Sequence, residues 1–139
     1  MIGDRITHPA ILSALAGAGH FSTILVSDAN YAASTTVGPN AVLVYLNLEA
    51  GTPSIPHVVE LVAKTIPIER RVSMATPEPA FDAVQNEVGK VLGPGIQHDT
   101  MSREEFYAAA RSENLALRIV SGDVRRFGNT LLTVGVRFE

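Results

Sequence analysis

Helix and strand patterns alternate along almost the whole chain, and this alternation restricts the possible folds more than any other feature. Apolar runs of strand length, rich in β-branched residues, are found at 23–27, 41–46, 71–75, 115–120 and 130–136. Apolar residues at helical spacing are found at 7–17, 54–66, 79–92 and 102–111. Such alternation predicts an α/β fold in which helices cover a mostly parallel sheet. We therefore expect residues 1–139 to form one compact domain, a Rossmann-like three-layer sandwich.

Several element ends carry recognisable signals. Thr7 is the expected N-cap of the first helix, with Pro9 in its first turn and a glycine, Gly17 or Gly19, at its end. The sequence Ser102-Arg103-Glu104-Glu105 has the form of a capping box, which predicts that a helix begins there. Residues 29–40 are small and polar and are expected to form a loop.

The composition excludes several classes of function. Because the chain has no cysteine, it has neither disulfides nor a thiolate nucleophile. Its basic residues are scattered and the net charge is −3, which argues against nucleic-acid binding. There is no apolar run long enough for a signal peptide or a membrane span, so we expect a cytoplasmic protein without a membrane partner. Charged residues make up only 18% of the chain, which fits either self-association or a core rich in Ala, Val and Leu.

His20 and Asp28 bracket the first predicted strand. In open α/β sheets, ligands bind at the carboxyl ends of strands, where Asp28 is expected to lie. Histidine gains and loses a proton near neutral pH, so a histidine and a carboxylate that converge at a crevice suit acid/base chemistry. Each residue also has an ordinary structural interpretation, His20 as a packing side chain and Asp28 as the cap of an Asx turn.

Other candidate sites have less support. No spacing of histidines or carboxylates matches a metal site, so no metal is expected. The glycines at 17 and 19 follow a helix rather than opening one, which favours a C-cap over a phosphate loop. A nucleophile elbow of the form Gly-x-Ser-x-Gly is absent. Arg103 is a cation at a helix start, a locally unfavourable place that hints at a function, and Asn129 beside Gly128 is otherwise a turn residue.

Four motifs in this order make the chain similar to a known family. They are the Gly19-His20 turn, Ser27-Asp28-Ala29-Asn30, Arg103 before Phe106-Tyr107, and the closing Phe127-Gly128-Asn129-Thr130-Leu131-Leu132. Together they resemble the ribose pyranase / fucose mutarotase family (RbsD/FucU) almost from end to end. Arg103 and the Asp-Ala-Asn turn resemble the fucose mutarotase branch, because the ribose pyranase branch usually has a histidine at the position of Arg103.

The resemblance implies an isomerase that interconverts the anomers or ring forms of a free aldose, fucose-like or ribose-like, without cofactor or metal. It implies that His20 is the catalytic acid/base and that Asp28 is its partner or a sugar ligand. It further implies that Arg103, Phe127 and Asn129 bind the substrate. The implied assembly is a ring-like homo-oligomer with sites near subunit interfaces.

The chain departs from the family pattern at Phe127. Family members commonly carry tyrosine there, so this position lacks a hydroxyl donor. Two alternatives to a mutarotase or pyranase therefore remain at the level of the sequence. One is a non-catalytic monosaccharide-binding or sensing protein on the same scaffold, and the other is an assembly protein without a small ligand.

Overall fold

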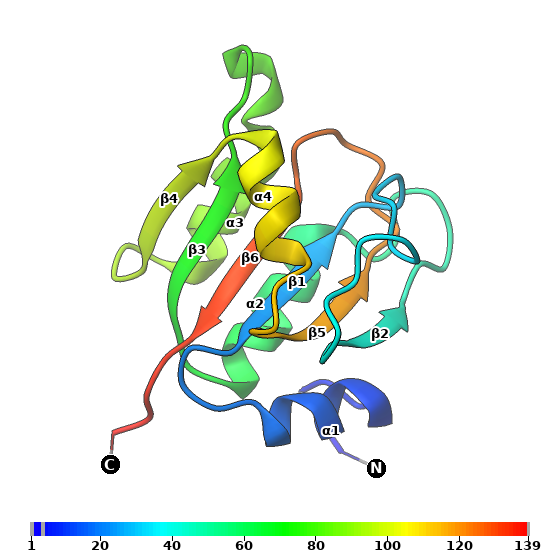
Figure 1. Ribbon diagram of the computed structural model, residues 1–139, viewed down its shortest axis with the longest axis vertical. Coiled ribbons are helices and arrows are strands. Elements are labelled where there is room, and N and C mark those ends of the chain that lie inside the picture. The colour runs from blue at the N-terminus through cyan, green and yellow to red at the C-terminus, as the bar shows by residue number, and fades with distance from the viewer. Residues whose placement is uncertain (1, 4, 139) are drawn as a thin grey trace.

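The computed structural model, which describes residues 2–3 and 5–138, contains one six-stranded sheet (Figure 1). The strand order is β2-β5-β1-β6-β3-β4. The strands are β1 (Thr23–Ser27), β2 (Val42–Tyr45), β3 (Ile68–Met74), β4 (Gln97–Met101), β5 (Leu115–Val120) and β6 (Thr130–Val134). Only β6 runs against its neighbours, pairing antiparallel with both β1 and β3, so the predicted mostly parallel sheet is confirmed.

Helices cover both faces of the sheet, which confirms the three-layer arrangement (Figure 1). On one face lie α1 (Pro9–Gly17), α2 (Ile55–Thr65) and α3 (Ala83–Leu92). Their apolar side chains pack with Ile24, Val26, Leu117 and Ile119 in the larger core cluster. On the other face, α4 (Arg103–Ala110) buries Phe106 in a smaller cluster that includes Leu25 of β1 and Leu115 of β5. No described helix is long and apolar enough to cross a bilayer.

Most element boundaries agree with the sequence patterns. The capping box is present, since Ser102 Oγ accepts from the Glu105 amide and a Glu105 carboxylate oxygen accepts from the Ser102 amide. The expectation for Thr7 was wrong, because His8 is the N-cap of α1 and its Nδ1 accepts from the Ile11 amide. The helix expected over 79–92 is divided into a 3₁₀ turn, η1 (Pro79–Phe81), followed by α3.

The reversed direction of β6 determines where the polar loops meet. The carboxyl ends of β1, β3 and β5 and the beginning of β6 all lie at the same edge of the sheet (Figure 1). The segments 28–40 and 121–129 meet there, since the Ala29 amide donates to the Asp123 carbonyl. This edge holds the polar pocket described next.

Candidate active site

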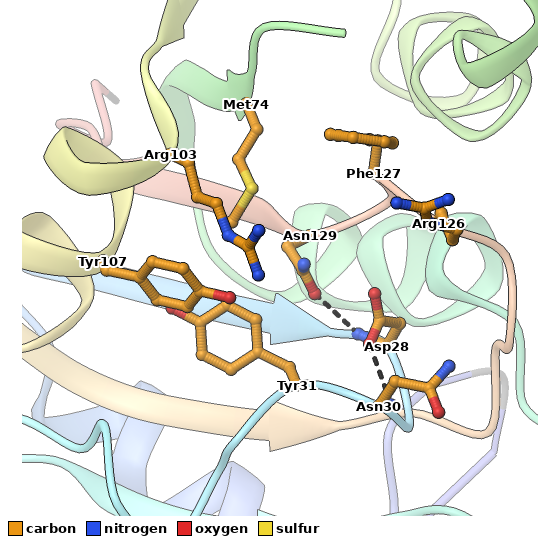
Figure 2. A pocket seen from close by; sticks show the side chains of 9 residues that line it. All are labelled: Asp28, Asn30, Tyr31, Met74, Arg103, Tyr107, Arg126, Phe127 and Asn129. Carbon is orange, nitrogen blue, oxygen red and sulfur yellow. Dashed lines mark hydrogen bonds between the residues drawn. The ribbon is translucent and has the colours of Figure 1, made fainter. Parts of the chain in front are cut away.

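A pocket of about 170 Å³ opens at this edge of the sheet, and side chains from several elements point into it (Figure 2). Its lining residues are Asp28, Asn30, Tyr31, Met74, Arg103, Tyr107, Arg126, Phe127 and Asn129. Four of the five predicted site residues, Asp28, Arg103, Phe127 and Asn129, are therefore brought together. The fifth, His20, lies elsewhere.

Asp28 is the buried acid of the pocket. It follows β1 directly and is only 6% exposed. Its amide donates to Asn129 Oδ1 at 2.8 Å, and its Oδ1 accepts from the Asn30 amide at 2.9 Å (Figure 2). Burial raises the pKa of Asp28, although hydrogen bonds from the Asn30 and Tyr31 amides and from Asn129 oppose the rise. The Asx turn expected here is present, and Asp28 lines the pocket.

The first two turns of α4 contribute a cation and a phenol. Arg103 and Tyr107 are four residues apart, so they lie on the same side of the helix. The Arg103 guanidinium carbon is 5.6 Å from the centre of the Tyr107 ring, within cation–π range. The carboxylates Glu104 and Glu105 in the same turn complement the positive end of the helix dipole. Arg103 lies in the pocket wall, where its N–H groups can donate hydrogen bonds to a ligand (Figure 2).

Tyr31 forms the floor beside Tyr107, with the two ring centres 5.0 Å apart. Burial raises the pKa of Tyr31 to about 12. Its phenol is therefore protonated at neutral pH. Tyr31 was not among the predicted sugar-binding residues, because a tyrosine in a polar loop carries no signal of its own.

A fully buried arginine fixes the segment that carries Tyr31. Arg118, in the middle of β5, donates through Nη1 to the Ala33 carbonyl at 3.1 Å, the Thr36 carbonyl at 2.7 Å and Thr36 Oγ1 at 2.9 Å. Its guanidinium carbon lies 4.4 Å from the Tyr31 ring centre. The sequence did contain a signal for this role, since a lone arginine interrupts the apolar run of β5.

Phe127 closes the opposite side of the pocket in an unusual backbone conformation. Its φ is 60°, in the left-handed region that non-glycine residues rarely occupy. The neighbouring Gly128 is tightly enclosed, because a Cβ there would come within 2.8 Å of Ile55 Cδ1. The ring of Phe127 lies 5.0 Å from that of Phe81. The phenols that line the pocket are therefore Tyr31 and Tyr107, from other elements.

His20 lies at the other end of β1. A five-residue strand separates it from Asp28, a distance of roughly 17 Å, so the two side chains do not converge within one chain. His20 Nε2 is 3.1 Å from Glu69 Oε2, and both side chains are 39% exposed. The ring of His20 stacks on Phe21 at 3.7 Å, and Phe21 has a φ of 71°. Phe21 and Phe127 are the non-glycine residues of the described chain with positive φ.

The other histidines lie outside the pocket. His8 caps α1, His57 lies in the first turn of α2, and His98 lies on β4, where its Nε2 is 2.9 Å from Ser73 Oγ. Over residues 2–3 and 5–138, no three histidine or carboxylate side chains gather closely enough to hold a metal ion. The pocket side chains, which include a carboxyl group, a guanidinium and two phenols, can donate and accept hydrogen bonds and transfer protons.

Fold and pocket together define an α/β protein with a polar site at the carboxyl edge of its sheet. Comparison with known proteins gives the family. The model of the RbsD / FucU transport protein family matches residues 1–137, and the chain belongs to this family.

Two curated relatives cover nearly the whole chain. A D-ribose pyranase from Exiguobacterium sibiricum is 30% identical over 133 residues, covering 96% of both chains. A fucose mutarotase from Mus musculus is 25% identical, covering 94% of this chain and 90% of its own length. Both branches of the family are thus represented among the relatives.

Solved structures show the same fold. Bacillus subtilis RbsD complexed with D-ribose matches with a TM-score of 0.85 at 20% identity, covering 99% of this chain and all of that one. The fucose mutarotase of Streptococcus pneumoniae in complex with L-fucose matches with a TM-score of 0.73 at 15% identity and similar coverage. These matches support the fold predicted from the helix and strand alternation.

Proposed function

We propose that this protein is a monosaccharide mutarotase or pyranase, an isomerase that interconverts anomers or ring forms of a free aldose of the fucose or ribose type. The observation that supports the proposal most is the buried Asp28, with its raised pKa, in a small pocket that also holds Arg103 and two phenols. The relatives named D-ribose pyranase and fucose mutarotase support the same activity.

The reaction needs two proton transfers. Opening the ring requires a proton delivered to the ring oxygen and another removed from the anomeric hydroxyl, and closing it from the other face gives the second anomer. A neutral imidazole can make both transfers in turn, and no covalent intermediate is needed. We assign this role to His20. Asp28 accepts a hydrogen bond from a sugar hydroxyl or stabilises the charged imidazole. Arg103 and Asn129 bind other sugar hydroxyl groups, and Phe127 packs against the sugar ring.

This assignment requires His20 from a second copy of the chain, because His20 and Asp28 of the same copy lie at opposite ends of β1. Three features support such a shared site. His20 and Glu69 are partly exposed, Phe21 is 64% exposed, and the backbone at Phe21 has positive φ. Strained residues of this kind persist mainly at functional sites. We therefore propose a ring-like homo-oligomer in the cytoplasm, with each site completed by its neighbour.

Saturation-transfer NMR on equilibrated fucose, ribose, galactose and glucose tests the activity. We expect faster anomer exchange for at least one sugar, and His20→Ala is expected to abolish it without changing the fold or assembly. Saturable sugar binding without faster exchange would instead indicate the non-catalytic sugar-binding protein. Neither binding nor exchange for any sugar would overturn both assignments.

Mixed assemblies test the shared site. His20→Ala and Asp28→Asn are each expected to be inactive, but co-refolded in equal amounts they should place intact His20 beside intact Asp28 in about a quarter of the sites. Recovery of activity supports a site built from two copies. Light scattering at 14.8 kDa, the mass of one chain, would contradict the oligomer.

A further inference from the structure

A second groove, separate from the sugar pocket, lies between α3 and Arg71 of β3. Its lining residues are Arg71, Gln85, Asn86, Gly89, Lys90, Gly93 and Pro94, and its volume is about 390 Å³. It shares no lining residue with the pocket that contains Asp28. Figure 1 shows α3 behind β3 and β4, on the face opposite to α4. A ligand in this groove would therefore leave the sugar pocket free.

Arg71 is the central cation of the groove, and it lacks an acidic partner. Its Nη1 donates to the carbonyl and to Oε1 of Gln85, both at 2.9 Å. Within the described chain, no carboxylate comes within ion-pair distance of Arg71, and burial lowers its pKa. Its neighbour Arg70 differs, since its Nε lies 2.6 Å from Asp99 Oδ2. The charge of Arg70 is therefore balanced by Asp99, whereas the charge of Arg71 is not balanced by a carboxylate within the described residues.

The groove side of α3 is shaped around Arg71. A Cβ at Gly89 would lie 3.0 Å from Arg71 Nη2, so a glycine in the middle of this helix leaves room for the guanidinium. Such a glycine costs a helix about 0.5–1 kcal/mol relative to alanine. Gln85 is 6% exposed and holds the arginine from the other side. Gly89 thus lowers the stability of α3 but leaves the space that the Arg71 guanidinium occupies.

The remaining lining residues suit an anion. Lys90 supplies a second positive charge next to Gly89, Asn86 supplies amide donors, and no carboxylate lines the groove. Glu87, the acid closest to them in sequence on α3, forms an ion pair with Arg125 instead. The adjoining hollow toward Thr76 does contain Asp82, so the Lys90 end is the electropositive part. Arginine presents a planar fork of N–H donors that matches a phosphate group.

We propose that this groove binds a small oxyanion, a phosphate group that is free or carried by a small metabolite, between Arg71 and Lys90. Because Gln85 already fixes the guanidinium, little side-chain freedom is lost when the anion binds. The site is independent of the sugar isomerase activity proposed above.

Titration of the isotopically labelled, assembled protein with inorganic phosphate, followed by amide chemical shifts, tests this site. We expect saturable shifts at the α3 residues of the groove. Arg71→Gln should weaken binding by at least about tenfold, which is the effect of losing a charge-assisted hydrogen-bond pair. Lys90→Gln should weaken it less.

Arg70→Gln is the matched control. It removes the same charge one residue away, on the opposite face of β3, and should leave phosphate affinity unchanged. The absence of saturable shifts in the unmodified protein, or equal losses in Arg70→Gln and Arg71→Gln, would overturn the proposal. Titrations with glucose and with glucose 6-phosphate distinguish free phosphate from a phosphorylated metabolite. If the ester binds more tightly than phosphate and its binding also depends on Arg71, the site is assigned to a phosphorylated metabolite.

Discussion

Asp28 and Asp123 follow two neighbouring parallel strands at the same edge of the sheet, yet their surroundings are opposite. Both are buried, at 6% and 2% exposure. Arg125 donates to both carboxylate oxygens of Asp123, at 3.0 and 2.9 Å, and the Ile55 amide donates to Oδ2 at 3.1 Å. In the described chain, no cation lies within ion-pair distance of Asp28, which accepts from the Asn30 amide.

The two pKa shifts follow from this difference. Burial raises the pKa of Asp28, and its hydrogen bonds only partly offset the rise. Burial acts in the same direction on Asp123, but the hydrogen bonds from Arg125 and from the Ile55 amide outweigh it and lower the pKa. Asp123, which is paired with Arg125, joins two segments of the fold through its bond to the Ile55 amide. Asp28 lines the pocket and stays available for a ligand. A buried carboxylate without a cation is therefore the better marker of the site.

The largest expected effect is on catalysis. Asp28→Asn should reduce anomer exchange by about 10²–10⁴-fold, the usual contribution of a group that takes part in acid/base catalysis. The backbone should not change, since an asparagine oxygen can still accept from the Asn30 amide. Saturation-transfer NMR gives the rate and circular dichroism checks the fold. Exchange at the unmodified rate would mean that Asp28 is only a turn residue.

The second effect is on stability. Asp123→Asn removes the charge that Arg125 and the Ile55 amide bind, and should cost about 1–3 kcal/mol of unfolding free energy. Denaturant unfolding measures the loss. The rate per folded molecule should stay near that of the unmodified protein. If Asp123→Asn instead abolished exchange in a folded protein, the contrast between the two acids would fail.

The third effect is a smaller one, on the pH dependence of stability. The folded-state pKa of Asp28 lies above its ordinary value of 3.8. The contribution of Asp28 to the unfolding free energy therefore falls as pH rises from 3.8 through the folded-state pKa. Asp28→Asn should therefore be as stable as the unmodified protein or more stable at pH 7, and the difference should vanish as pH falls below 3.8. Asp123→Asn should show the opposite pH dependence. Its unfolding free energy should be lower than that of the unmodified protein at pH 7, and this difference should shrink as pH falls through the lowered pKa of Asp123. Thermal melts from pH 3 to 7 compare the two slopes.

The smallest expected effect comes from Phe127→Tyr, which adds a phenol to the wall of the pocket that contains Asp28. We expect an increase in exchange of less than about tenfold for at least one aldose, since an auxiliary donor contributes less than the main acid/base group. Sugar affinity should change little. A stable variant with unchanged or slower exchange would mean that Tyr31 or Tyr107 already supplies the donor, and Tyr107→Phe would then be the informative comparison.

The sequence predicted the central strands and their helices well because apolar periodicity reports burial directly. It missed β4, the edge strand Gln97–Met101, because this strand is polar and mostly exposed and so carries no apolar pattern. The reversed direction of β6 also leaves no local signal, since strand direction depends on pairing across the sheet.

For the pocket, motif order indicated Asp28, Arg103, Phe127 and Asn129, and the structure places them together. Met74 and Arg126 were not predicted, because neither residue type is distinctive at its position. The position of His20 could not be derived from spacing alone. Flanking one strand implies proximity in sequence, but a strand holds its two ends apart.

The position of β6 has a consequence for folding kinetics. β6 is the last strand in chain order but lies between β1 and β3, so without it the sheet separates into β2-β5-β1 and β3-β4. Its pairing with β1 joins residues more than a hundred positions apart, and such distant contacts slow the crossing of the folding barrier. Because Asn129 immediately precedes β6 and its Oδ1 accepts from the Asp28 amide, we expect the pocket to form together with the pairing of β1 and β6.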